Sequence, residues 1–314
     1  MRLVQGGEVS ALVKVIWAVT LIMATGCSKE IPEDWDEPVN VPPVSKFLAS
    51  VAQWTKPFPA FRVIGNLYGV GGYDLGVFLI ATEDGHILIN TGVEGSFQQI
   101  AANVASLGYA IEDIKILLSM QAHWDHVAEF ARIKTLTNAQ VWATADDAML
   151  LEDGGKSDPS NPTRGARHMF RPVKVDRLIA DGDVITLGNL ELRVHEHPGH
   201  TPGSTSYSMR VIEDGRTYNV AIVNMGTINP GVRLLDEPSY PGIDEDFAKT
   251  FSRQKAMLVD VWVSAHAGFY RLHQKYQPEQ IYNAKTFYDP QGYLAAIDQF
   301  EQLYLQQRQE ELAD

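Results

Sequence analysis

The chain has 314 residues, of which 45% are hydrophobic and 21% are charged, a composition typical of globular proteins and not of disordered or fibrous ones. Asp and Glu total 39 against 26 Lys and Arg, so the net charge is −13. No basic run offers a cationic face to phosphate groups, and the composition therefore argues against nucleic acid as a partner.

The N-terminal segment has the pattern of a secretory signal. Val15 to Thr25 is an apolar stretch of eleven residues behind Arg2 and Lys14. Because a membrane-spanning helix needs about 20 apolar residues, this stretch is too short to cross a bilayer. Basic, apolar and small residues follow one another in the order that signal peptides use.

The single cysteine, Cys27, directly follows this segment, and Ala24-Thr25-Gly26-Cys27 resembles the bacterial lipoprotein cleavage box. We therefore expect a signal peptide of lipoprotein type over residues 1–26, a Pro-rich acidic tether over 27–45, and one folded domain over 46–314. The expected location is the periplasm, with an outer-membrane anchor on Cys27. Conventional cleavage to a soluble periplasmic protein is the alternative.

Within the domain, short strands alternate with helical patterns. In chain order the strands are predicted at 61–70, 77–82, 86–90, 116–119, 184–187, 190–196, 205–209, 218–223 and 261–264. The helices are predicted at 96–107, 127–136, 245–257 and 292–312, and a Gly-, Pro-, Ser- and Asn-rich stretch at 153–171 separates the two series. Two β-rich halves that each carry helices predict two packed sheets covered outside by helices.

The strongest chemical signal follows the predicted strand 116–119. Gln121, His123, Asp125 and His126 lie within six residues there, which puts several nitrogen and oxygen donors on one tight loop. Imidazole and carboxylate are ligands that suit zinc.

Two more histidines follow predicted strands. His200 stands in His197-Pro198-Gly199-His200-Thr201-Pro202-Gly203, where Pro and Gly force a sharp turn that presents the side chain outward. His266 follows the strand 261–264. We expect the three strand-end sites to converge on one edge of the two-sheet fold.

On these motifs the chain resembles the metallo-β-lactamase superfamily, whose hallmark is H-x-H-x-D-H, then a His in a P-G-H-T context, then a late His. The match here is Gln121-x-His123-x-Asp125-His126, followed by His200 and His266. The resemblance extends from about Trp54 to the last predicted strand. It implies a mixed α+β or α/β fold, the four-layer αββα sandwich, with zinc bound between the sheet edges.

Two absences narrow the resemblance to one branch. Many hydrolases of this fold carry a bridging acid after the strand that corresponds to 218–223, where this chain has Asn224 and Met225. The first two subclasses of zinc β-lactamases use a cysteine ligand, which this domain lacks. The chain is therefore similar to the third subclass, and Gln121 and Asn90 resemble its minority branch with Gln in place of the first His.

This resemblance implies two metal sites, which we name site one (Gln121, His123 and His200) and site two (Asp125, His126 and His266). We expect site one to bind zinc more weakly, because an amide oxygen is a poorer zinc ligand than imidazole. The expected cofactor is one or two Zn²⁺ per chain, with site two filled first.

The implied activity is zinc-dependent hydrolysis of the β-lactam amide bond of penicillins, cephalosporins and carbapenems, which confers resistance. Asp125 is the expected catalytic residue, aiming the nucleophile and shuttling a proton. The resemblance also suggests substrate contacts at Trp54, His168, Met225 and Thr227. The partner is then a small-molecule β-lactam, the protein a monomer, and Cys27 its one link to a membrane.

Two alternatives remain open at this point. One is another metal-dependent hydrolase of the same fold, a lactonase or thioesterase, which the missing bridging acid disfavours. The other is a weakly active zinc-binding lipoprotein in which Gln121 marks decay of the site.

Overall fold

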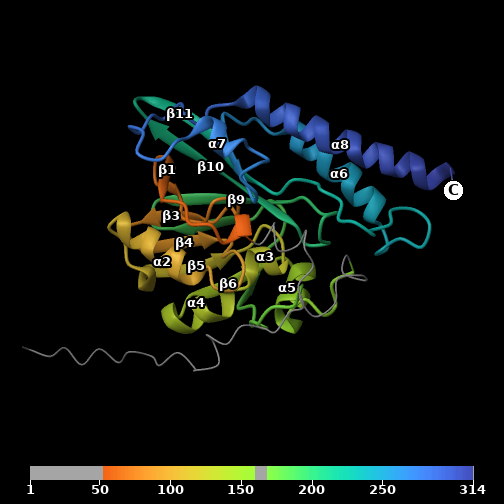
Figure 1. Cartoon of the computed structure of the whole chain (residues 1–314), viewed down its shortest axis with the longest axis horizontal. Coiled ribbons are helices and arrows are strands. Elements are labelled where there is room, and N and C mark those ends of the chain that lie inside the picture. Colours follow the sequence, from red (N-terminus) through yellow and green to blue (C-terminus); the bar gives the residue numbers. More distant parts are fainter. Residues whose placement is uncertain (1–51, 160–167, 314) are drawn as a thin grey trace, which may run out of the picture. The chain divides into compact units, whose positions relative to one another are not determined.

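The computed structural model describes residues 52–159 and 168–313 (Figure 1). Every described residue belongs to one compact unit within residues 31–314. The predicted signal peptide, the tether and Cys27 lie outside the described residues.

The first sheet has seven strands, paired in the order of the chain. They are β1 (Phe61–Ile64), β2 (Leu67–Gly69), β3 (Phe78–Thr82), β4 (Gly85–Ile89), β5 (Ile114–Leu118), β6 (Gln140–Ala143) and β7 (Arg177–Leu178). Neighbours from β1 to β4 are antiparallel, whereas β4, β5, β6 and β7 are parallel. β4 and β5 therefore end at the same edge of the sheet.

The second sheet has five strands in the order β12, β11, β10, β9, β8. Their bounds are β8 (Val184–Leu187), β9 (Leu190–Glu196), β10 (Thr205–Glu213), β11 (Arg216–Val223) and β12 (Val261–Ser264). β11 and β12 are parallel and the other pairs antiparallel. An isolated bridge between Leu75 and His266 links the segment before β3 to the loop after β12.

Helices cover the outer faces of both sheets. The helical elements of the described residues are α2 (Phe97–Ser106), the 3-10 turn η2 (Ile111–Asp113), α3 (Trp124–Val127), α4 (Phe130–Thr137), α5 (Ala145–Asp153), α6 (Ile243–Ala256), α7 (Leu272–Lys275) and α8 (Pro290–Ala313). Figure 1 shows α6 and α8 along the second sheet and α2 and α4 along the first. The αββα layering predicted from the sequence is confirmed, and no helix in the described part of the chain is long and apolar enough to cross a membrane.

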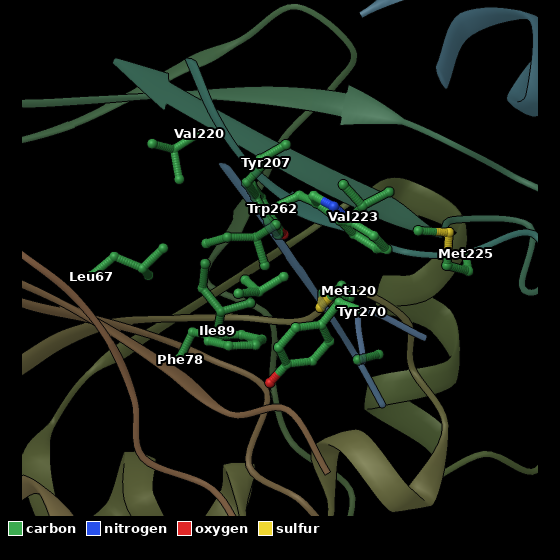
Figure 2. Packing of buried hydrophobic residues seen from close by; sticks show 14 of the residues in the cluster. Leu67, Phe78, Ile89, Met120, Tyr207, Val220, Val223, Met225, Trp262 and Tyr270 are labelled. Carbon is green, nitrogen blue, oxygen red and sulfur yellow. The ribbon is translucent and has the colours of Figure 1, made fainter. Parts of the chain in front are cut away.

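Strand alternation divides the apolar side chains between the layers. Ile89 of β4 packs between the sheets near Tyr207 of β10 (Figure 2), and Ile87 belongs to the same cluster. Leu88 points to the helical side, where it joins the cluster of Val104 of α2. Each fully buried aliphatic side chain contributes about 1.5–3 kcal/mol to folding. The central strands are thus buried on both faces and hold the loops at their ends rigidly.

The prediction of one strand over 61–70 is wrong. β1 and β2 pair as an antiparallel hairpin, and Gly65, at φ +56°, makes the sharp turn between them. A Cβ at Gly65 would also lie 2.5 Å from Val211 Cγ1. The sequence pattern also missed β6, α5 and β7. β6 has only four residues, and it is defined by pairing with β5 instead of by alternation.

Candidate metal centre

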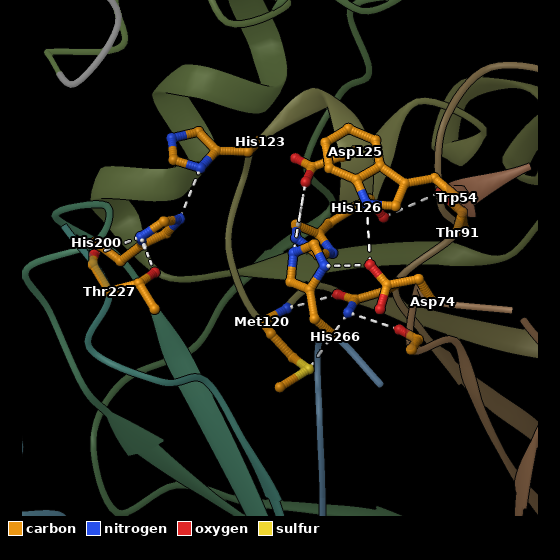
Figure 3. Close-up of polar contacts among 12 residues, drawn as sticks. Trp54, Asp74, Thr91, Met120, His123, Asp125, His126, His200, Thr227 and His266 are labelled. Atoms are coloured by element: carbon orange, nitrogen blue, oxygen red, sulfur yellow. Dashed lines mark hydrogen bonds and ion pairs between the residues drawn. The ribbon is translucent and has the colours of Figure 1, made fainter. Parts of the chain in front are cut away.

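Three loops at the shared edge of the two sheets bring the predicted ligands together (Figure 3). The loop after β5 carries Gln121 and His123 and runs into α3, which carries Asp125 and His126. The turn after β9 carries His200, and the loop after β12 carries His266. In the second sheet β9 and β12 run in the same direction, because β10 is antiparallel to both β9 and β11 and β11 is parallel to β12. The segments that follow β9 and β12 therefore start at the same edge of that sheet.

Asp125, His126 and His266 form one compact cluster at site two. Asp125 Oδ2 lies 3.4 Å from His126 Nε2 and 3.7 Å from His266 Nε2. One potential ligand atom from each residue falls within 4.8 Å of the others. His126 is fully buried, and neither of its ring nitrogens has a hydrogen-bond partner among the described residues.

His123 and His200 form the second cluster, at site one. His123 Nδ1 lies 3.0 Å from His200 Nε2. On its far side, His200 Nδ1 donates to the carbonyl oxygen of Thr227 at 2.7 Å, which leaves the lone pair of Nε2 directed at His123. Gly199, at φ +129°, makes the turn, and a Cβ there would collide with the Phe247 ring at 2.8 Å.

Gln121 is buried on the same loop as His123. Only 3% of it is exposed, and its Oε1 accepts no hydrogen bond from the residues that the structure describes. A buried amide oxygen without a partner costs free energy, so it is a group that a bound cation would stabilise.

Charge and burial set the protonation of these groups. Burial alone would raise the pKa of Asp125, but the imidazoles of His126, His266 and His123 lower it to about 2. Burial lowers the pKa of His126 to about 4, although Asp125 opposes this, and burial likewise holds the pKa of His200 well below its usual value. At neutral pH the carboxylate is therefore ionised and both imidazoles neutral, which are the forms that coordinate metals.

These residues fit zinc. Four imidazoles, one carboxylate and an unpaired amide oxygen are nitrogen and oxygen ligands of the kind that Zn²⁺ takes. The fold and this centre together define a class of two-sheet, metal-dependent hydrolases.

Comparisons with known proteins agree with this class. The family model of the metallo-beta-lactamase superfamily matches residues 77–211. A beta-lactamase from Chitinophaga pinensis is 44% identical, with a TM-score of 0.77, over 81% of this chain and 96% of that one. GOB-18 from Elizabethkingia meningoseptica is 38% identical (TM-score 0.79; 87% and 97%), and the class B3 di-zinc enzyme LRA-12 from an Alaskan soil metagenome is 41% identical (0.79; 86% and 99%). This chain belongs to the metallo-beta-lactamase superfamily.

Curated relatives of other activity match less of the chain. A hydroxyacylglutathione hydrolase of Rhodospirillum rubrum is 29% identical over 110 residues, which are 35% of this chain and 34% of that protein. The chain spans about a third of the length of the curated relatives that it matches first. These relatives support a hydrolase of this fold without defining its substrate.

The predicted substrate residues differ in their surroundings. The Trp54 ring lies 5.9 Å from His266 and 5.5 Å from Trp124, whose ring lies 5.6 Å from His168. Thr227 contacts His200 through its carbonyl and its hydroxyl. Met225 is only 1% exposed and packs in the core between the sheets (Figure 2), so its role in binding substrate stays a prediction.

The sequence reasoning missed two carboxylates beside the metal centre. Asp158 Oδ2 lies 3.2 Å from His123 Nε2, and Asp74 Oδ2 lies 3.3 Å from His266 Nδ1. Asp158 belongs to a Gly-Gly-Lys-Ser-Asp pattern that could have drawn attention to it. Nothing in the spacing around Asp74 connects it to a histidine 192 residues away.

Proposed function

We propose that this protein is a zinc-dependent β-lactamase that opens the amide bond of penicillins, cephalosporins and carbapenems. The observation that carries this proposal is the donor set. A cluster of imidazoles with an amide oxygen lies at site one, a cluster of imidazoles with a carboxylate lies at site two, and no acid follows β11. Asn224 occupies that position, and its main-chain carbonyl oxygen accepts a hydrogen bond from Gln254 Nε2 at 2.7 Å. Similarity to β-lactamases over nearly their whole length supports the same choice.

Zinc, when bound, supplies a Lewis acid that makes water a nucleophile near neutral pH and stabilises negative charge. Site two would hold it through Asp125, His126 and His266, and site one through Gln121, His123 and His200. Site one is the weaker of the two, since Gln121 offers an amide oxygen where an imidazole would bind zinc more strongly.

Asp125 performs the proton transfer. Hydrolysis forms a bond from the water oxygen to the carbonyl carbon, breaks the carbon–nitrogen bond and puts a proton on the leaving nitrogen. Asp125 is ionised at neutral pH because its pKa is about 2, so it can orient water and accept its proton. It then returns that proton to the lactam nitrogen.

Hydrolysis of a thioester is the second candidate, because curated relatives include a hydroxyacylglutathione hydrolase and an acyl-coenzyme A thioesterase. Turnover of nitrocefin, an acyl-glutathione and a lactone by the purified protein, before and after chelation, separates the candidates. We expect nitrocefin to be the preferred substrate, with activity lost on chelation and restored by zinc. Full activity of the metal-free protein, or preference for the thioester, would refute the proposal.

We further propose that the mature protein is a periplasmic monomer with a lipid anchor on Cys27. The support is the signal-like sequence of residues 1–27. Mass spectrometry of the mature N-terminus tests the anchor, since an acylated Cys27 carries the added mass and a conventionally cleaved chain does not.

A further inference from the structure

We propose that Asp158 and Asp74 are positioning residues, one for each metal site, which hold the ligand histidines His123 and His266 in the tautomer that coordinates zinc. The inference rests on the proposed zinc function and assigns residues that the ligand pattern does not contain. Both carboxylates come from segments outside the three ligand-bearing loops.

At site one, the contact is fully enclosed by protein. The side chains of His123 and Asp158 are 4% and 5% exposed, and Nε2 faces the carboxylate at 3.2 Å. Because a carboxylate accepts hydrogen bonds, Nε2 must carry the proton, and the lone pair of Nδ1 then points to His200. His200 donates its own Nδ1 proton to Thr227, so two lone pairs meet at 3.0 Å, an arrangement that a cation stabilises.

At site two, the same arrangement uses the opposite ring nitrogen. His266 Nδ1 donates to Asp74 Oδ2 at 3.3 Å, which turns Nε2 toward Asp125 (Figure 3). Trp54 Nε1 donates to the same Asp74 oxygen at 3.0 Å. Asp74 thus fixes both a metal ligand and the indole ring beside it.

The chemistry gives each carboxylate a defined effect. A carboxylate behind a metal-bound histidine fixes its ring orientation and makes the imidazole more basic, and its loss costs about 10–100-fold in metal affinity. Asp158 would in this way strengthen the site that Gln121 weakens.

The test measures zinc affinity by competition with a chromophoric chelator, a readout independent of catalysis. We expect Asp74→Asn to weaken the tighter binding step and Asp158→Asn the weaker step, each by about 10–100-fold, with the other step unchanged. Asp74→Glu and Asp158→Glu should restore part of the affinity. The double variant should show both losses, because the two pairs have no residue in common.

Two matched controls separate histidine positioning from local folding. Asp153→Asn disturbs the turn that leads to Asp158, since Asp153 accepts from the N–H groups of Lys156 and Ser157, both at 2.8 Å. Trp54→Phe removes the second donor to Asp74 and leaves the pair with His266. Both controls should keep near wild-type affinity.

Each result decides a separate point. Unchanged affinity in Asp74→Asn and Asp158→Asn, or equal losses in the controls, would overturn the positioning role while leaving the zinc proposal intact. A wild-type protein that binds no zinc would instead overturn the proposed function, and the positioning role with it.

Discussion

Asn90 Oδ1 accepts a hydrogen bond from the main-chain N–H of Met120 at 2.9 Å. Asn90 Nδ2 donates to the carbonyl oxygen of Gly76 at 3.0 Å and contacts Met120 Sδ at 3.3 Å. A fully buried amide after β4 therefore fixes the backbone directly before Gln121. Asn90 acts on Gln121 through the main chain of Met120, the residue directly before it. This contact is a structural reason for the joint presence of Asn90 and Gln121.

Replacing Asn90 by Asp should destabilise the protein. The carboxylate would lack the N–H donor and face the Gly76 carbonyl, which leaves a buried acceptor unpaired at a cost of about 1–3 kcal/mol. Asn90 also has φ +64°, a conformation that Asn and Asp both tolerate. The substitution should therefore not change the backbone strain at this position. Urea unfolding measures the difference, and equal midpoints would show that the donor is unimportant.

Replacing Gln121 by His should strengthen zinc binding at site one. Imidazole is the better zinc ligand, and we expect at least about a tenfold gain in affinity for the weaker step, which corresponds to 1.4 kcal/mol. Competition with a chelator and metal analysis after dialysis measure the gain. Unchanged stoichiometry and affinity would mean that Gln121 does not limit this site.

Replacing Asp125 by Asn should abolish most activity. The variant loses an ionised ligand and the group that moves the proton, and general acid–base catalysis alone contributes about 10²–10⁴-fold. We expect kcat/KM for nitrocefin to fall by at least that factor even with excess zinc. Because the pKa of Asp125 is held at about 2, the wild-type carboxylate should stay ionised down to pH 4. Retained activity in the Asn variant would assign the proton transfer elsewhere.

Asp147 should make the metal-free protein less stable as the pH rises. Burial raises its pKa to about 6, despite hydrogen bonds from Thr201 and the Gly203 N–H. Because the native pKa exceeds the unfolded value of about 4, the native state is favoured by protonation, and its stability falls between pH 4 and 6 by about 3 kcal/mol.

The variant Asp147→Asn isolates this effect. It stays neutral and keeps an acceptor for Gly203, so its free energy of unfolding should lack the fall between pH 4 and 6 that Asp147 causes. Unfolding by urea at several pH values, in protein treated with a chelator, gives the difference between variant and wild type. A difference that does not change with pH would contradict the prediction.

Trp54 should contribute to substrate binding more than to the chemical step. Its ring lies beside His266 and Trp124, and it is held by Asp74. We expect Trp54→Ala to raise KM for nitrocefin about 5–10-fold, as the loss of roughly 1 kcal/mol of aromatic contact implies, with little change in kcat. Trp54→Phe, which keeps an aromatic ring, should show a smaller rise. A fall confined to kcat would place Trp54 in the catalytic step.

The sequence by itself determined the layered fold and predicted the residues that gather at the candidate metal centre. The alternation of apolar residues along strands and the Gln121 to His126 motif are local patterns. Each can be recognised in a single sequence because its residues lie close together in the chain. The turns at His200 and His266 were predictable for the same reason.

Only the tertiary structure decided which carboxylates contact the predicted ligand histidines. Asp74 reaches His266 because the segment before β3 bridges to the loop after β12, and Asp158 reaches His123 from beyond α5. The short strand β6 likewise depends on its pairing with β5, which lies more than 20 residues earlier in the chain. No residue spacing in the sequence reveals contacts between distant segments, because these contacts form only when the two sheets fold against each other.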